Sequence, residues 1–154
     1  ERAVTFTRIG DVDLNTLPDP ASQAVRVPSP ASAWHGRYHE TSSPDTNSFK
    51  AYSRDTSVET NCLRTGERCV SYSHYDSSYD IRVFADGTWI TDYVGSARCE
   101  DNKSFSTHFH SEFPLPQPPQ DPITLLAGHA HNVATGSACA GTYDFGVKYE
   151  RTGD

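Results

Sequence analysis

Four cysteines are the feature that most constrains the fold of this chain of 154 residues, because its supply of aliphatic side chains is small. Leu, Ile, Val and Phe together number 27, and the formal net charge is −7. Such a composition is close to that of disordered chains, so we expect covalent cross-links and the 17 aromatic residues to supply much of the stability. The length is that of one domain.

The cysteines are even in number and lack the C-x-x-C spacing of zinc sites, which favours disulfides and an extracytoplasmic compartment. Three connectivities are open. We favour Cys62–Cys69, which would close a hydrophilic turn, together with Cys99–Cys139. Loops of 8 and 41 residues would stabilise the fold by about 2.5 and 4 kcal/mol. The alternative is four free thiols in a cytosolic protein.

Alternation of apolar and polar residues predicts strands along most of the chain. The clearest segments are 34–40, a hairpin over 58–75, a second hairpin in which Asp86-Gly87 joins 79–84 to 88–93, then 104–113 and 141–151. On the last strand, Tyr143, Phe145, Val147 and Tyr149 would share one face. The prediction is a mainly β fold, an antiparallel sandwich or small barrel of about eight short strands, stapled by two disulfides. At most one short helix is expected, over 121–129, where a helix or turn is preferred to a strand.

Residues 1–33 are rich in proline and are interpreted as a linker or wrapping arm, followed by one β domain over 34–154. The chain has no methionine and no apolar run of about 18 residues. We therefore expect a fragment or mature form of a longer protein, with a signal peptide, a lipid-anchor segment or a transmembrane helix as alternatives for the missing part. Either of the last two would tether the chain to a membrane through a missing upstream segment. The acidic balance argues against nucleic acid as a partner.

Histidines are the main candidates for chemistry. His108, His110 and Glu112 alternate along one strand, as do His129 and His131, so these four histidines are candidate metal ligands. Exposed surface histidines are the preferred interpretation, and a pH-sensitive patch is a further alternative.

No catalytic residue and no cofactor site is predicted, because the sequence has neither a Gly-x-Ser-x-Gly elbow nor a Gly-rich phosphate loop. The acidic pairs Glu100-Asp101 and Asp76/Asp80 are interpreted as solvated groups in turns.

Several segments together resemble the C-terminal extracytoplasmic domains of mycobacterial membrane-spanning Ser/Thr protein kinases, and related secreted or lipid-anchored mycobacterial proteins. They are the 62–69 loop (CLRTGERC), Asp86-Gly-Thr-Trp89, the proline segment 114–126 (PLPQPPQDPITLL) with Gly128-His129, and Arg151-Thr-Gly-Asp154. The resemblance runs from about Trp34 to the end of the chain.

This resemblance implies a non-catalytic, signal-sensing domain on the outer face of the membrane. Its partner would be a small molecule or a cell-envelope ligand, and a homodimer is one arrangement it suggests. One alternative is a free-standing secreted or lipid-anchored binding protein of the same fold. A more distant alternative is a secreted metal-dependent enzyme that uses the histidines.

Overall fold

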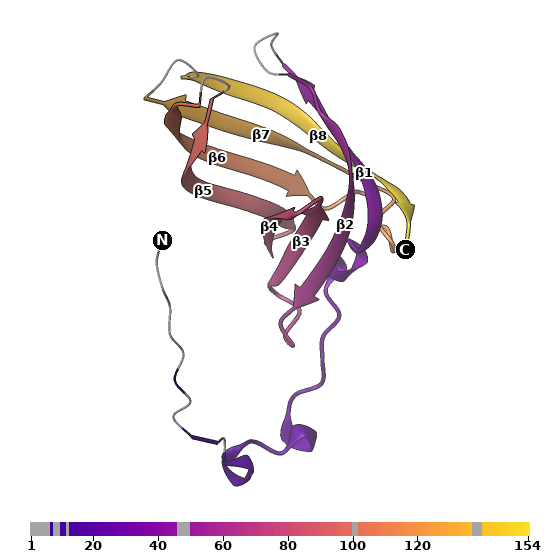
Figure 1. Ribbon diagram of the computed structural model, residues 1–154. Coiled ribbons are helices and arrows are strands. Elements are labelled where there is room, and N and C mark those ends of the chain that lie inside the picture. Colours follow the sequence, from indigo (N-terminus) through magenta and orange to yellow (C-terminus); the bar gives the residue numbers. More distant parts are fainter. Residues whose placement is uncertain (1–6, 8–9, 12, 46–49, 100–101, 137–139) are drawn as a thin grey trace.

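The computed structural model describes residues 7, 10–11, 13–45, 50–99, 102–136 and 140–154. Within them, successive strands pair antiparallel and the last strand pairs with the first, so that eight strands form a closed barrel (Figure 1). The strands are β1 (Gly36–Pro44), β2 (Ser53–Cys62), β3 (Cys69–Tyr75), β4 (Ser78–Ala85), β5 (Thr88–Arg98), β6 (Ser104–Pro114), β7 (Leu125–Thr135) and β8 (Gly141–Gly153). The predicted mainly β fold is confirmed, as a barrel.

Alternation sets which side chains enter the barrel. On β8, Phe145, Val147 and Tyr149 are buried, whereas Lys148 and Glu150 face solvent. The predicted Asp86-Gly87 hairpin turn joins β4 to β5, and Gly87 has a φ of +81°, which glycine adopts without steric cost.

The core is aromatic at the end of the barrel where the chain enters. Trp34 lies 5.1 Å from Trp89 and 5.4 Å from Tyr149, measured between ring centroids, and all three are fully buried. The backbone beside Trp34 is tied to the loop before β7, because Ile123 N–H donates to the carbonyl of Ala33 at 2.9 Å. Large aromatic side chains thus fill the interior of the barrel, in a chain that has few aliphatic residues to fill it.

The Cys62–Cys69 disulfide is confirmed. It joins the last residue of β2 to the first of β3, with Cα atoms 3.9 Å apart. The second predicted bridge, Cys99–Cys139, involves Cys139, which lies outside the described residues. One disulfide is therefore described where two were predicted, and none of the described cysteines is free.

The prediction of a helix or turn over 121–129 was wrong, because β7 begins at Leu125 and includes His129. Leu126 and Ala130 are buried while Leu125 and Ala127 are exposed, which is the two-residue period of a strand. Pairing with both β6 and β8 satisfies the backbone hydrogen-bonding groups of this segment. The local sequence cannot reveal these pairings, because they involve other segments of the chain.

Helical structure in the described residues consists of 3-10 turns before β1: η1 (Leu14–Thr16), η2 (Pro20–Ser22) and η3 (Pro30–Ala33). This exceeds the single short helix expected. Side chains of Asp13, Asp19 and Ser29 accept hydrogen bonds from backbone N–H groups two residues later, so each turn has its own cap. Ala31 and Ala33 are buried, while the division of the chain at residue 33 stays a prediction.

No helix in the described parts of the chain is both long enough and apolar enough to span a membrane.

Candidate functional site

The barrel wall is interrupted around the tip of the β3–β4 hairpin, because this hairpin is shorter than the strands on either side (Figure 1). β2 begins at Ser53 but pairs with β3 only from Ser57 onward. On the other side, β5 pairs with β4 only over Thr88–Ile90, although it continues to Arg98. We call the region around the hairpin tip (Tyr75–Ser78) and the diverging parts of β2 and β5 the notch.

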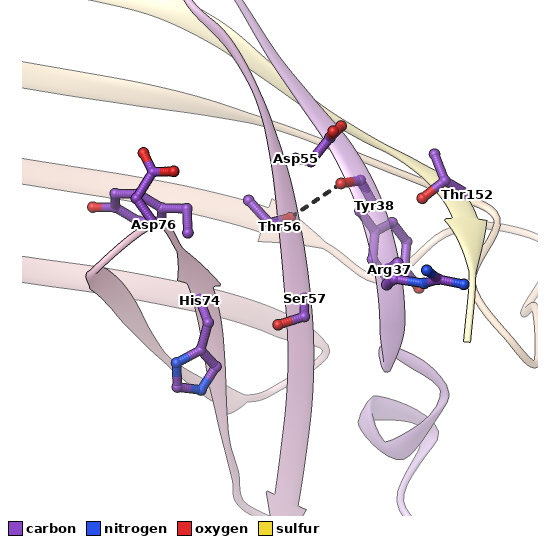
Figure 2. Close-up of a pocket in the computed structure, with 9 residues that line it drawn as sticks. Arg37, Tyr38, Asp55, Thr56, Ser57, His74, Asp76 and Thr152 are labelled. Atoms are coloured by element: carbon purple, nitrogen blue, oxygen red, sulfur yellow. Dashed lines mark hydrogen bonds between the residues drawn. The ribbon is translucent and has the colours of Figure 1, made fainter.

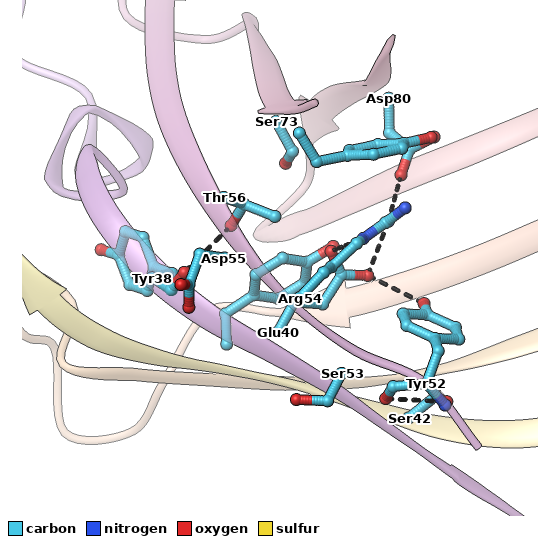
Figure 3. Close-up of polar contacts among 12 residues, drawn as sticks. Tyr38, Glu40, Ser42, Tyr52, Ser53, Arg54, Asp55, Thr56, Ser73 and Asp80 are labelled. Carbon is cyan, nitrogen blue, oxygen red and sulfur yellow. Dashed lines mark hydrogen bonds and ion pairs between the residues drawn. The ribbon is translucent and has the colours of Figure 1, made fainter. Parts of the chain in front are cut away.

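An ion-pair network lies inside the barrel at the notch (Figure 3). Arg54 on β2 binds Glu40 on β1 with two hydrogen bonds, of 2.7 and 2.9 Å, and binds Asp80 on β4 at 3.0 Å. The Glu40 side chain is only 1% exposed, whereas those of Arg54 and Asp80 are 25% and 34% exposed. The network therefore runs from a buried carboxylate to one that solvent can reach.

Aromatic rings hold the Arg54 guanidinium in place. Its central carbon lies 3.4 Å from the ring centroid of Tyr75 and 5.0 Å from that of Tyr52. The Tyr52 hydroxyl donates to Glu40 at 2.8 Å, and the Tyr75 hydroxyl donates to Asp80 at 3.3 Å. Each carboxylate thus has both a guanidinium and a phenol as partners.

A second arginine, Arg82, lies deeper in the barrel and is almost fully buried. It donates to Ser73 at 2.9 Å and to the Tyr149 hydroxyl at 2.7 Å, and it lies 3.7 Å from Asp80. The Phe113 ring is 4.9 Å from its guanidinium carbon. The buried Nε of Arg82 has no hydrogen-bond partner among the described residues.

Tyr52, Tyr149 and Arg54 keep their protons near neutral pH. Burial raises the pKa of Tyr52, and the adjacent Glu40 raises it further. Burial also raises the pKa of Tyr149. For Arg54, burial lowers the pKa, but the hydrogen bonds and charge of Glu40 outweigh it and the net shift is upward. The site therefore offers phenol donors, permanent cations and carboxylate acceptors in fixed positions, an arrangement suited to polar recognition.

Two grooves open on either side of the hairpin tip, and Tyr75 lines both. The first, between β2 and β3, has a volume of about 460 Å³. Figure 2 shows polar side chains along it: Arg37 from β1, Asp55 and Ser57 from β2, and His74 from β3. This groove can accept a small polar ligand through hydrogen bonds of either sense.

The second groove has a volume of about 630 Å³ and lies where β4 and β5 separate. Apolar side chains from both strands, including Tyr79, Ile81 and Tyr93, share its lining with Asp80 and Asp92. Its lining runs along both strands, from Ser78 to Val83 and from Ile90 to Tyr93, and combines apolar with polar side chains.

The predicted metal candidates lie elsewhere, on the outer face of β6 and β7. His108 and His110 both contact Asp92, at 3.1 and 2.9 Å. His129 contacts Asp45 at 2.9 Å, and His131 contacts Asp144 at 2.7 Å, so every one of the four histidines has a carboxylate partner.

In the described residues, no three His, Cys, Asp or Glu side chains are arranged to hold a metal ion. The contacts with Asp92 and Glu112 raise the pKa of His110. The hydrogen bonds that Asp92 makes with His110 and His108 lower the pKa of Asp92. The geometry is that of a row of ion pairs, formed when the histidines are protonated.

Sequence reasoning missed the charged residues of the notch. Asp80 was interpreted as a solvated turn residue, yet it contacts the partly exposed Arg54 and the buried Arg82. One signal was available in the two-residue period of the strands. Glu40 lies two residues after the core residue Tyr38, and Arg82 lies two residues before Phe84, so both charged side chains occupy inward positions of otherwise apolar strands.

Comparison with known proteins supports the fold. No family model matches the chain, and no curated protein matches it. Among solved structures, the monomer form of the M. tuberculosis PknI sensor domain aligns with a TM-score of 0.55 and 15% sequence identity, over 78% of this chain and 88% of that one. The chain therefore shares its fold with the PknI sensor domain.

The similarity to the PknI sensor domain confirms the resemblance predicted from the cysteine loop and the proline segment, as far as the fold is concerned. The Cys62–Cys69 disulfide fits the extracytoplasmic side of a membrane, where disulfides persist. The comparison covers most of both chains, so the similarity is not confined to a single hairpin.

Proposed function

We propose that the chain is the extracytoplasmic signal-sensing domain of a transmembrane Ser/Thr protein kinase, and that it is itself non-catalytic. The observation that carries this proposal is the fold it shares with the PknI sensor domain. A small molecule or a cell-envelope ligand would bind at the notch and shift the arrangement of the attached kinase. To do so, the ligand must bind one arrangement more tightly than the other.

The notch is the favoured ligand site because it combines accessibility with fixed polar groups. Asp80 and Arg54 are partly exposed, and each contacts a buried partner, Arg82 and Glu40 respectively. The groove of Figure 2 adds Arg37, Asp55 and His74 within reach of a ligand at the hairpin tip. Pre-organised polar groups reduce the entropic cost of binding.

The binding part of the proposal is tested by NMR titration of the chain with soluble fragments of the cell envelope. We expect shift changes confined to the notch, and loss of binding by at least tenfold in Ser57→Trp, which places a large ring in the groove. Ser106→Trp on β6 is the matched control, because Ser106 is exposed on a strand that does not line either groove. Equal binding by both variants would contradict the assignment of the notch.

The kinase part is tested separately, on the intact protein that contains this chain. Membrane fractions should show Ser/Thr phosphorylation that responds to the same fragments, and Ser57→Trp should abolish the response while basal phosphorylation remains. A protein that binds at the notch but has no kinase activity would be a free-standing secreted or lipid-anchored binding protein.

A further inference from the structure

The β3–β4 hairpin reverses the usual distribution of side chains in a barrel wall. Its inward positions include the polar residues Ser71, Ser73 and Arg82, which are buried. Arg82 donates to Ser73 at 2.9 Å and Trp89 donates to Ser71 at 3.0 Å, so hydrogen bonds fix this orientation of the hairpin. Three cross-strand pairs point outward, and all are apolar or aromatic: Val70 with Val83, Tyr72 with Ile81, and His74 with Tyr79. Antiparallel sheets usually carry polar side chains on a solvated face, so this outer face is suited to contact with another molecule.

This outer face is exposed to solvent in the described structure. Ile81 and Val83 are 44% and 46% exposed, and Leu63, in the turn between β2 and β3, is 58% exposed. Next to the Cys62–Cys69 disulfide, the face is hollowed into a third groove with a volume of about 510 Å³. The exposed apolar face thus includes a concave site that can enclose part of a ligand.

Two polar side chains, Asn61 and Arg68, interrupt an otherwise largely apolar lining. The apolar surface comes from the disulfide, Leu63, Val70, Tyr72 and Val83. None of the described residues that line the groove is acidic, although the chain has a net charge of −7. Glu59 lies two residues before Asn61 on β2, but it accepts a hydrogen bond from the Asn61 amide at 2.9 Å and does not line the groove. The groove therefore offers one cation beside an apolar surface.

The Arg68 guanidinium is available to a ligand. Arg68 is exposed, and among the described residues its side chain has no hydrogen bond or ion pair. Its backbone is held in place, because Leu63 N–H donates to the carbonyl of Arg68 at 2.9 Å across the turn. The other arginine of the turn, Arg64, is engaged with the arm and donates to the carbonyl of Ala24 at 3.0 Å. An anionic group bound at Arg68 would gain a charge-assisted hydrogen bond.

The backbone of β3 is paired on both sides at this groove, which argues against a peptide strand as the occupant. Asn61 pairs with Val70, and Val70 pairs with Val83, so neither edge of β3 is free here. A ligand must therefore bind through side chains, and an alkyl chain suits an apolar groove because it has no polar groups to leave unpaired. We propose that the groove binds one molecule of an anionic amphiphile, with its alkyl chain along the apolar lining and its head group at Arg68.

NMR titration of the 154-residue chain with octyl phosphate, kept below its micelle concentration, tests the inference. Amide shifts should change at residues 61–72 and at Val83, while those of the hairpin tip at 75–78 stay unchanged. Octan-1-ol has the same alkyl chain without the charge and should bind about threefold more weakly, as expected for the loss of an exposed ion pair. Butyl phosphate should bind about 15-fold more weakly, because each of the four missing methylenes, when half buried, contributes about a factor of two.

Two variants with matched controls locate the site. Val83→Asp places a carboxylate in the groove and should weaken octyl phosphate binding about tenfold. Val94→Asp makes the same change at a 74% exposed position outside the groove and should leave binding unchanged. Arg68→Gln should weaken octyl phosphate binding about threefold and leave octan-1-ol binding unchanged. Arg26→Gln, at an exposed position of the arm, should change neither. The amides of β6 report whether the barrel stays folded in every variant.

Equal binding of octyl phosphate by Val83→Asp and Val94→Asp would overturn the inference, and so would unchanged binding by Arg68→Gln. Binding to phosphatidylglycerol vesicles without binding of monomeric octyl phosphate would also overturn it, because the face would then meet a membrane surface. The Ser57→Trp variant of the notch should bind octyl phosphate normally, and loss of binding in that variant would place the amphiphile in the notch instead. The inference does not depend on the kinase assignment, so the two can fail separately.

Discussion

Replacing Glu40 with methionine should destabilise the barrel strongly, although methionine has a similar volume. The Glu40 side chain is 1% exposed and accepts two hydrogen bonds from Arg54, so its removal leaves a guanidinium with a single carboxylate partner, Asp80. Removing one partner of a buried ion pair lowers the free energy of unfolding by about 3–5 kcal/mol, because the other charge stays buried without its partner. Arg54 is 25% exposed and keeps its ion pair with Asp80, so we expect a loss at the lower end of this range, about 3 kcal/mol.

The converse substitution, Arg54→Met, should cost more, about 4 kcal/mol, because it leaves Glu40 buried with the Tyr52 hydroxyl as its remaining partner in the network. In the double variant no buried charge of the pair remains unpaired, and Asp80 keeps Tyr75 and Arg82. Its cost should therefore be well below the sum of the two single costs. A coupling energy of about 3 kcal/mol is expected from the cycle.

Urea unfolding at pH 7 measures these free energies, with the fluorescence of the buried residues Trp34 and Trp89 as the signal. For a chain of this length, a loss of about 3 kcal/mol corresponds to a fall in Tm of roughly 6–12 °C. If the two single costs add in the double variant to within about 0.5 kcal/mol, the ion pair is not the cause of the destabilisation and the reasoning is refuted.

Three further predictions concern the remaining features. Replacing Cys62 and Cys69 together by serine should lower the free energy of unfolding by about 2.5 kcal/mol in urea titration, with the barrel still folded; no change would contradict it. Asp92→Asn should lower the pKa of His110 in an NMR titration, because the contact raises it in the folded state. The stabilisation from this contact needs both groups charged, so it should be fully present between about pH 4 and 6.5, the unfolded values. It should be lost as the pH rises through the raised pKa of His110 or falls through the lowered pKa of Asp92; an unchanged pKa would contradict the pairing. Gly128→Ala should cost roughly 2–4 kcal/mol, because the added Cβ would meet a backbone oxygen of β6 at 2.2 Å; a neutral effect in the same urea assay would show that β6 can move.

The sequence predicted the strands best where alternation and turn chemistry agree. Asp86-Gly87 marked a hairpin because a two-residue turn needs positive φ, and both residues have it, at 52° and 81°. The segment around Leu126 was predicted as a helix or turn because its apolar residues are adjacent in the sequence and do not alternate. Pairing with β6 and β8 makes the segment an extended strand. Barrel closure between β8 and β1 likewise depends on contacts between residues far apart in the chain.

The candidate site was harder to predict than the fold. The histidines were candidates because imidazole binds metals, yet the structure places each of the four against a carboxylate on the outer face, with Asp92 shared by His108 and His110. The residues of the notch carry no motif. Glu40 and Arg54 become recognisable only when their strands are placed next to each other, since they are direct cross-strand partners.

The position of the charged network follows from the short β3–β4 hairpin. A closed barrel needs its interior filled, and at the end near Trp34 aromatic rings do so. Around the hairpin tip, β2 pairs with β3 only from Ser57 onward and β5 pairs with β4 only as far as Ile90, so apolar side chains in the interior there would be exposed to water. Arg54 and Asp80 occupy this position, and each is fixed by partners deeper in the barrel. In the described residues, the interruption that leaves β5 unpaired with β4 beyond Ile90 is therefore the same one that requires a polar interior, so a change at Arg54 would alter both the stability of the barrel and the polar surface of the notch.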